Sequence, residues 1–211
     1  MDALLNYLET TFKPNEPIIE SDLQYSGMSK NMIRQHLKRL TDEKEISRYD
    51  NGVYYIPKTS ILNFKVVPPI HEVIKKKYLI EGTNTIGYLS GLDFANMIHL
   101  TTQVPNEPEV VTNKASRIVR ETKIRGYYVL LRKPRTIIND DNYRVLQFLD
   151  LMNEIDKISE LEGSDMQKAI KDYMQIAGIS FTDLEKYLFL YPDRIYKNMF
   201  IAGVLYGISP Q

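Results

Sequence analysis

The order of the elements predicted in the first 57 residues constrains the fold more strongly than any other feature of this sequence. Asp50-Asn51-Gly52 lies between two β-like stretches, 45–49 and 53–57, and an Asx-Gly pair in that position is a strong hairpin signal. Before the hairpin the sequence predicts three short helices, at 2–12, 18–26 and 29–43. Three helices followed by a hairpin are the order of a winged helix-turn-helix.

The helix predicted over 29–43 begins at Ser29, a favourable N-cap residue, and divides into two faces. Ile33, Leu37 and Leu40 fall together on one side of the helix. The opposite side carries four polar residues, Asn31, Arg34, Gln35 and Lys38. A recognition helix needs this division, because one face docks on its own core while the other enters the major groove of DNA.

We therefore expect base contacts from the four polar residues, because Arg pairs bidentately with guanine and Asn or Gln pairs with adenine. Phosphate contacts are expected from residues that flank this face or lie on the hairpin, namely Ser29, Lys30, Arg39, Arg48 and Asn51. Two plainer interpretations stand beside this one: a winged helix that binds another protein, and a basic helix face that is only solvated.

The stretch 57–69 has proline at both ends and predicts a connection between two domains, 1–60 and 61–211. In the second domain, the β-like runs 108–113, 116–124 and 127–133 predict a small antiparallel sheet, with helices at 69–78 and 87–100. The pairs Ser164/Gln167 and Thr182/Glu185 match capping boxes of later helices. The predicted fold class is α+β: a winged helix-turn-helix, a sheet-containing part at 61–138 and a helical layer at 139–211.

The formal net charge is zero, with 27 basic and 27 acidic side chains, but the charge is unevenly distributed along the chain. Residues 65–138 hold 12 basic and 6 acidic side chains, and residues 139–211 hold 7 and 12. Eight basic residues lie between 112 and 135 and predict a patch able to meet phosphate backbones: Lys114, Arg117, Arg120, Lys123, Arg125, Arg132, Lys133 and Arg135. The alternative is that the basic and acidic thirds simply attract one another in the folded protein.

Several classes of function find no support in the sequence. The absence of cysteine excludes disulfides and thiol chemistry and fits a reducing cytoplasm, where we expect this protein to be soluble and away from membranes. The three histidines are scattered, with His36 expected on a helix surface and His99 at the edge of the core. The acidic residues from 150 to 165 fit a solvated helix face better than a metal site. We therefore expect no enzyme, metal or cofactor.

The stretch from Gly87 to Pro134 resembles the AbiE-type antitoxin family (AbiEi). The resemblance rests on four segments: a Gly-Tyr-x-Ser-Gly segment leading into a helix, a Leu-Thr-Thr-Gln-Val-Pro block, a Val-Thr-Asn strand and a basic Arg-Lys-Pro-Arg exit. In this sequence they are 87–91, 100–105, 111–113 and 132–135. His99 departs from the family pattern, which would have a small residue before Leu100.

The resemblance implies a bacterial antitoxin of a type IV toxin–antitoxin system, active in abortive infection and phage defence. Its N-terminal domain would repress transcription of its own operon by binding inverted repeats in double-stranded promoter DNA. Its second domain would counter a nucleotidyltransferase-like toxin without forming a stable complex with it. The alternative from another class is a protein- or RNA-interaction module that uses the basic sheet and binds no specific DNA.

Overall fold

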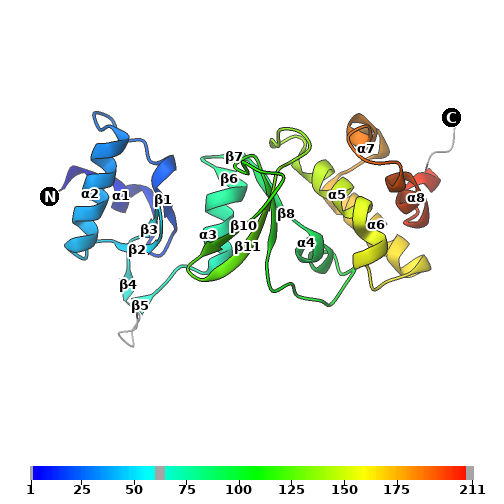
Figure 1. The fold of residues 1–211 in the computed structure, drawn as a ribbon, viewed down its shortest axis with the longest axis horizontal. Coiled ribbons are helices and arrows are strands. Elements are labelled where there is room, and N and C mark those ends of the chain that lie inside the picture. The colour runs from blue at the N-terminus through cyan, green and yellow to red at the C-terminus, as the bar shows by residue number, and fades with distance from the viewer. Residues whose placement is uncertain (1, 60–64, 208–211) are drawn as a thin grey trace. The chain divides into compact units, whose positions relative to one another are not determined.

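The computed structural model describes residues 2–59 and 65–207, and within them the chain has the expected α+β fold (Figure 1). Two compact units are present. The first comprises Met1–Thr83 with Ile124–Gly126, and the second comprises Asn84–Lys123 with Tyr127–Gln211. The domain boundary expected at residue 60 lies outside the described residues. Residues 65–83, which were expected in the second domain, group with the first unit.

The first unit begins with helix α1 (Ala3–Thr11), continues to helix α2 (Lys30–Asp42) and then forms the hairpin of β2 (Ser47–Asp50) and β3 (Val53–Tyr55). The antiparallel pairing of β2 with β3 confirms the Asn51-Gly52 hairpin prediction. The core beneath them contains Leu4 and Leu8 of α1, the apolar face of α2, and Ile46 and Tyr54. A register shift between Arg48 and Asp50 marks a bulge in the hairpin.

The helix predicted over 18–26 is wrong. Ile18–Ile19 forms strand β1, which pairs antiparallel with β3, and Glu20–Asp22 is a single 3-10 turn. Pairing with β3 satisfies the backbone of this stretch and buries both isoleucine side chains. A segment this short gains little as a helix, because the first helical turn is costly to nucleate.

The first unit continues beyond the hairpin. Strands β4 (Lys58–Thr59) and β5 (Lys65–Val66) pair antiparallel. Helix α3 (Ile70–Ile74) follows Pro69 and runs into a π-helical turn, Lys75–Leu79, and strand β6 (Ile80–Glu81). An ion pair between Lys76 and Glu16 (2.7 Å) ties this turn to the loop after α1.

The second unit opens with the short strand β7 (Asn84–Thr85) and contains a four-stranded sheet in the order β10-β11-β9-β8. The bounds of the sheet strands are Gly87–Ser90 for β8, Glu109–Thr112 for β9, Val119–Ile124 for β10 and Tyr127–Arg132 for β11. The prediction of an antiparallel sheet is wrong for one pair, since β9 and β11 run parallel. The chain crosses from β9 to β10 at the edge of the sheet. It then returns as β11 between these two strands, and β11 runs in the same direction as β9.

The helix predicted over 87–100 is only partly correct. Gly87–Ser90 is strand β8, and helix α4 is restricted to Gly91–Met97. Strand β8 pairs antiparallel with β9, and Tyr88 lies opposite Val111 in the buried part of the sheet. The helix therefore begins at Gly91, four residues later than its apolar spacing predicted.

Four helices form the C-terminal layer: α5 (Tyr143–Ile158), α6 (Gly163–Ala177), α7 (Phe181–Leu188) and α8 (Arg194–Ile201), followed by a 3-10 turn, Val204–Gly207. Neither predicted capping box exists as such. Helix α6 is preceded by Glu162 without a side-chain cap, and the box of α7 is made by Ser180 and Asp183. Helix α5 is the centre of the core, with Phe148, Leu149 and Met152 fully buried.

No helix of the described residues combines the length and the apolar composition that crossing a membrane requires.

Candidate nucleic-acid interface

Helix α2 presents the two faces that the sequence predicted. Ile33, Leu37 and Leu40 are buried in the first unit, which confirms the apolar face. The polar residues Asn31, Arg34, Gln35 and Lys38 are all exposed. Ser29 caps the helix as predicted, because its hydroxyl accepts the amide of Met32 (3.3 Å).

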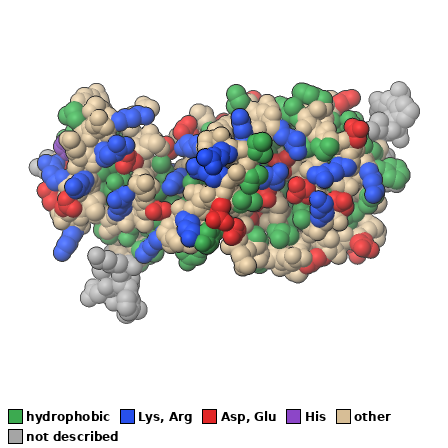
Figure 2. Space-filling model, viewed as in Figure 1, with side chains coloured by type: hydrophobic (Ala, Val, Ile, Leu, Met, Phe, Trp, Pro, Cys, Tyr) green, Lys and Arg blue, Asp and Glu red, His purple; other side chains and the backbone are tan. Residues whose placement is uncertain are grey.

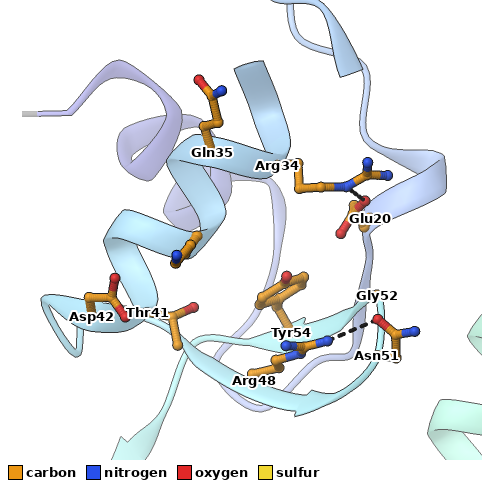
Figure 3. A pocket seen from close by; sticks show the side chains of 10 residues that line it. Glu20, Arg34, Gln35, Thr41, Asp42, Arg48, Asn51, Gly52 and Tyr54 are labelled. Carbon is orange, nitrogen blue, oxygen red and sulfur yellow. Dashed lines mark hydrogen bonds and ion pairs between the residues drawn. The ribbon is translucent and has the colours of Figure 1, made fainter. Parts of the chain in front are cut away.

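A groove runs between the polar face of α2 and the β2–β3 hairpin (Figure 3). Helix α2 contributes Arg34, Gln35, Lys38, Thr41 and Asp42, and the hairpin contributes Arg48, Asn51, Gly52 and Tyr54. Glu20 of the 3-10 turn also lines the groove. The structure therefore brings five of the nine residues predicted to contact DNA around one concave surface, namely Arg34, Gln35, Lys38, Arg48 and Asn51.

Arg34 is held at the mouth of this groove by one carboxylate. Its Nε donates to Oε1 of Glu20 (2.8 Å), while its side chain stays 63% exposed. Glu20 itself is only 17% exposed. Burial, together with the Glu20 carboxylate, raises the pKa of Tyr54. The bond uses Nε, and the exposed guanidinium keeps two terminal nitrogens for a further acceptor.

The hairpin orders its own polar side chains. Arg48 donates from a terminal nitrogen to Oδ1 of Asn51 (2.9 Å) and from Nε to the carbonyl of Asp50 (3.3 Å). Both Arg48 and Asn51 are exposed. The side chains of Lys38 and Gln35, by contrast, form no hydrogen bond or ion pair with any described residue, so they are available to a ligand.

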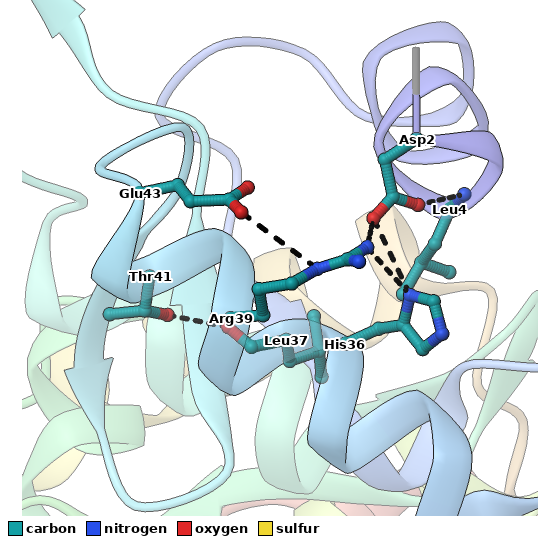
Figure 4. Close-up of polar contacts among 7 residues, drawn as sticks. All are labelled: Asp2, Leu4, His36, Leu37, Arg39, Thr41 and Glu43. Atoms are coloured by element: carbon teal, nitrogen blue, oxygen red, sulfur yellow. Dashed lines mark hydrogen bonds and ion pairs between the residues drawn. The ribbon is translucent and has the colours of Figure 1, made fainter.

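Arg39, predicted to contact phosphate, is engaged on another side of α2 (Figure 4). Its guanidinium pairs with Asp2, which also caps α1 by accepting the Leu4 amide (2.8 Å). Glu43 lies 4.0 Å from the Arg39 Nε, and His36 contacts both Asp2 and Arg39. Arg39 thus joins α2 to α1, and the groove's lining does not include it.

The eight basic residues predicted to form one patch are divided by the structure. Arg125 groups with the first unit, while the other seven belong to the second. Arg117, Arg120, Lys123 and Lys133 are exposed, and Lys123 lies over the ring of Tyr128 (4.1 Å). Figure 2 shows basic and acidic side chains interspersed on the visible face. Counted by unit, the first holds 13 basic and 11 acidic side chains and the second 14 and 16, so neither unit is strongly charged.

Arg132 and Arg135 are committed to a cluster that sequence reasoning missed. Arg132 pairs with Glu109 (2.5 Å), and Nε of Arg135 lies 3.8 Å from Asp150. Asp150 is buried on α5 and accepts the hydroxyl of Tyr88 (2.8 Å). Burial raises the pKa of Asp150. The solvated helix face expected for 150–165 is therefore wrong at Asp150, and only its position on the buried side of α5 could have indicated this.

The Thr-Thr-Gln block, residues 101–103, forms a loop whose polar groups bond to one carboxylate, that of Glu160. Glu160 accepts the amide of Thr102 (2.7 Å) and the side chain of Gln103 (3.0 Å), and these bonds lower the Glu160 pKa. His99, just before the block, has a φ of 62° after the end of α4. That left-handed conformation favours glycine or asparagine, and His99 is exposed rather than at the core edge as expected.

Among the described residues, no group of three or more His, Asp or Glu side chains is arranged to hold a metal ion. The fold and the groove thus define an α+β protein with a groove of polar side chains between a helix and a hairpin. Residues 12–175 match the model of a family of unknown function, DUF6088, and the chain belongs to that family. A search of curated proteins finds no match.

Proposed function

We propose that this protein binds double-stranded DNA through its first unit, with α2 in the major groove and the β2–β3 hairpin beside it as a wing. The observation that carries the proposal is the groove that Arg34, Gln35 and Lys38 of α2 line together with Arg48 and Asn51 of the hairpin. An amphipathic helix followed by a hairpin is the arrangement that winged helix-turn-helix proteins use. In this proposal the chain acts in the cytoplasm as a transcriptional repressor rather than as an enzyme.

The chemistry of the groove supports recognition of bases more than simple attraction to phosphate. Arg34 and Gln35 are side chains that pair with base edges, and Arg34 is pre-oriented by Glu20. Glu20 and Asp42 also line the groove and reduce its positive charge. The affinity for DNA would therefore come mainly from a few side-chain contacts. The preference for one DNA sequence over another would depend on the same contacts.

The test is an electrophoretic mobility shift with the DNA upstream of this chain's own gene, against a scrambled duplex of equal length. Arg34→Ala combined with Lys38→Ala should weaken binding of the upstream DNA severely, because both side chains are exposed and neither supports the core. Lys168→Ala with Lys171→Ala removes the same charge from the exposed side of α6 and should leave binding unchanged. A wild-type chain that binds neither duplex at low salt would sink the proposal.

The wider role that we propose is that of an antitoxin that represses its own operon. The support for this role is the resemblance of 87–134 to the AbiE-type family. The family that matches residues 12–175 is of unknown function and gives this role no further support. The toxin would be a nucleotidyltransferase-like protein encoded beside this chain. Expression of the neighbouring gene alone should arrest growth and co-expression should restore it, and a harmless neighbour would contradict the role.

The alternative, a protein- or RNA-interaction module on the basic sheet, has weaker support. Arg132 and Arg135 pair with buried or half-buried carboxylates, and Arg125 groups with the other unit. The four exposed cations that remain lie on the β10 edge and its flanks.

A further inference from the structure

Strand β10 lies at an edge of the four-stranded sheet, and among the described strands it is paired with β11 alone. Its first five side chains are exposed or half-buried, and only Ile124 is buried. The opposite edge, β8, is shorter and leads directly into α4. An edge strand carries unpaired backbone groups, which makes it a template for pairing with another chain.

The β10–β11 turn determines which backbone groups of β10 point outward. Arg125 and Gly126 form a two-residue connection with φ values of 49° and 89°, which is the signature of a type I′ hairpin turn. In such a hairpin the residues flanking the turn, Ile124 and Tyr127, exchange hydrogen bonds. By alternation, the backbone groups of Val119, Glu121 and Lys123 point away from β11 and are the ones a further strand would use.

Among the antiparallel registers centred on Arg120, Glu121, Thr122 and Lys123, one suits the charges of β10. A register centred on Arg120, on Glu121 or on Lys123 places like charges directly opposite each other at the two-fold axis, which is destabilising. A register centred on Thr122 places Glu121 opposite Lys123 of the second copy, and does so twice by symmetry. It also uses the outward groups of Glu121 and Lys123 for the backbone hydrogen bonds.

We propose that β10 pairs with β10 of a second copy of this chain, antiparallel and in the register centred on Thr122. The sheets of the two copies would then form one continuous sheet of eight strands. The proposal does not depend on DNA binding.

The side chains of β10 are arranged for this partner more than for an unrelated strand. Charges on an edge strand normally oppose indiscriminate pairing, and here they are unfavourable in three of the four registers centred on residues 120–123. The Lys123 ammonium lies 4.1 Å from the centre of the Tyr128 ring, which holds it on the face of the sheet that Glu121 shares by alternation. Glu121 and Lys123 therefore share one face of the sheet, and a second copy would present its own Glu121 and Lys123 on that same face.

Disulfide trapping tests the register directly, because the chain contains no cysteine of its own. Thr122→Cys places one thiol on each side of the two-fold axis, in a non-hydrogen-bonded pair with Cα atoms about 4.5 Å apart, within disulfide reach. Arg120→Cys lies on the same face of β10, but its two copies would be roughly 14 Å apart along the strands. Mild oxidation should give a covalent dimer with Thr122→Cys and none with Arg120→Cys. Equal yields from both variants, or none from Thr122→Cys, would overturn the register.

Charge exchange tests the same pairing without oxidation, by sedimentation over a wide range of concentration. Glu121→Lys and Lys123→Glu should each shift the chain to monomer, and mixing the two variants should restore dimers because both cross-strand pairs regain opposite charges. The double variant should dimerise like the wild type. Glu107→Lys, an exposed change of equal charge, is the control and should have no effect. A wild type that is monomeric throughout, or a dimer insensitive to Glu121→Lys, would contradict the proposal, and circular dichroism checks that each variant is folded.

Discussion

Single residues of the candidate groove owe their roles to partners that lie far away in the sequence. The periodicity of α2 predicted which of its side chains are exposed, and the structure confirms this for Arg34 and Lys38. It could not predict that Glu20, fourteen residues earlier, holds Arg34, or that Asp2 takes Arg39 away from the groove. Exposure follows from local helix geometry, whereas an ion pair depends on how separate segments fold together.

Glu20 is the residue on which we expect specificity to depend. In Glu20→Gln the carboxylate that orients Arg34 is lost, and the groove becomes less acidic. Binding to unrelated DNA should therefore strengthen while the preference for the upstream sequence falls. Fluorescence anisotropy with both duplexes measures the ratio of the two dissociation constants.

Asp42→Asn is the matched control, because it removes a carboxylate from the same groove and Asp42 has no hydrogen bond or ion pair with Arg34. This variant should raise both affinities and keep their ratio. If Glu20→Gln also keeps the ratio, Glu20 does not position Arg34 for base contacts.

At the scale of the elements, the sequence predicted those that a local signal determines and missed those that depend on pairing with distant strands. The β2–β3 hairpin and α2 are where they were expected, because a turn signal and a full apolar stripe fix them locally. Strands β1 and β8 were predicted as helix, since their few apolar residues fit either period. Their strand conformation comes from pairing with β3 and β9, which lie elsewhere in the sequence.

Helix α7 gives a measurable case of a displaced boundary. The Ser180 hydroxyl accepts the Asp183 amide, and the Asp183 carboxylate accepts the Ser180 amide and hydroxyl. Ser180→Ala should lower the free energy of unfolding by about 1 kcal/mol in urea titrations. Thr182→Ala, at the position the sequence favoured as the cap, is exposed inside the helix and should change it little. The reverse order of effects would mean that the helix begins where the sequence predicted.

For the whole molecule, the basic and acidic thirds of the sequence do not become a basic and an acidic unit of the folded protein. Lys75, Lys76 and Lys77 of the basic third belong to the first unit, and Arg132 and Arg135 are neutralised within the second. No pattern in the linear sequence reports such neutralisation. The division into units also differs from the one that the proline-bounded stretch 57–69 favoured.

This redistribution predicts a shallow salt dependence for DNA binding. Four exposed cations of the first unit, Lys30, Arg34, Lys38 and Arg48, lie on or beside the groove. Lys30 and Arg48 are the two expected on phosphates, and two phosphate contacts give a slope of about −2 in a plot of log affinity against log salt concentration. Engagement of Arg117, Arg120, Lys123 and Lys133 as well would steepen the slope to about −5. Anisotropy titrations across a salt series, analysed per bound copy, distinguish the two, and the steeper value would show that the second unit also meets the DNA.

The carboxylate of Asp150 has a consequence for how the second unit opens. It joins three separate parts of that unit: Tyr88 donates to it from the sheet, α5 carries it, and Arg135, stacked on the ring of Tyr191, reaches it from the loop after β11. Detaching any one of them would leave a buried charge or hydroxyl without its partner, which is costly. Sheet and helices should therefore exchange their slowest amide hydrogens together, as one cooperative foldon rather than as separate layers.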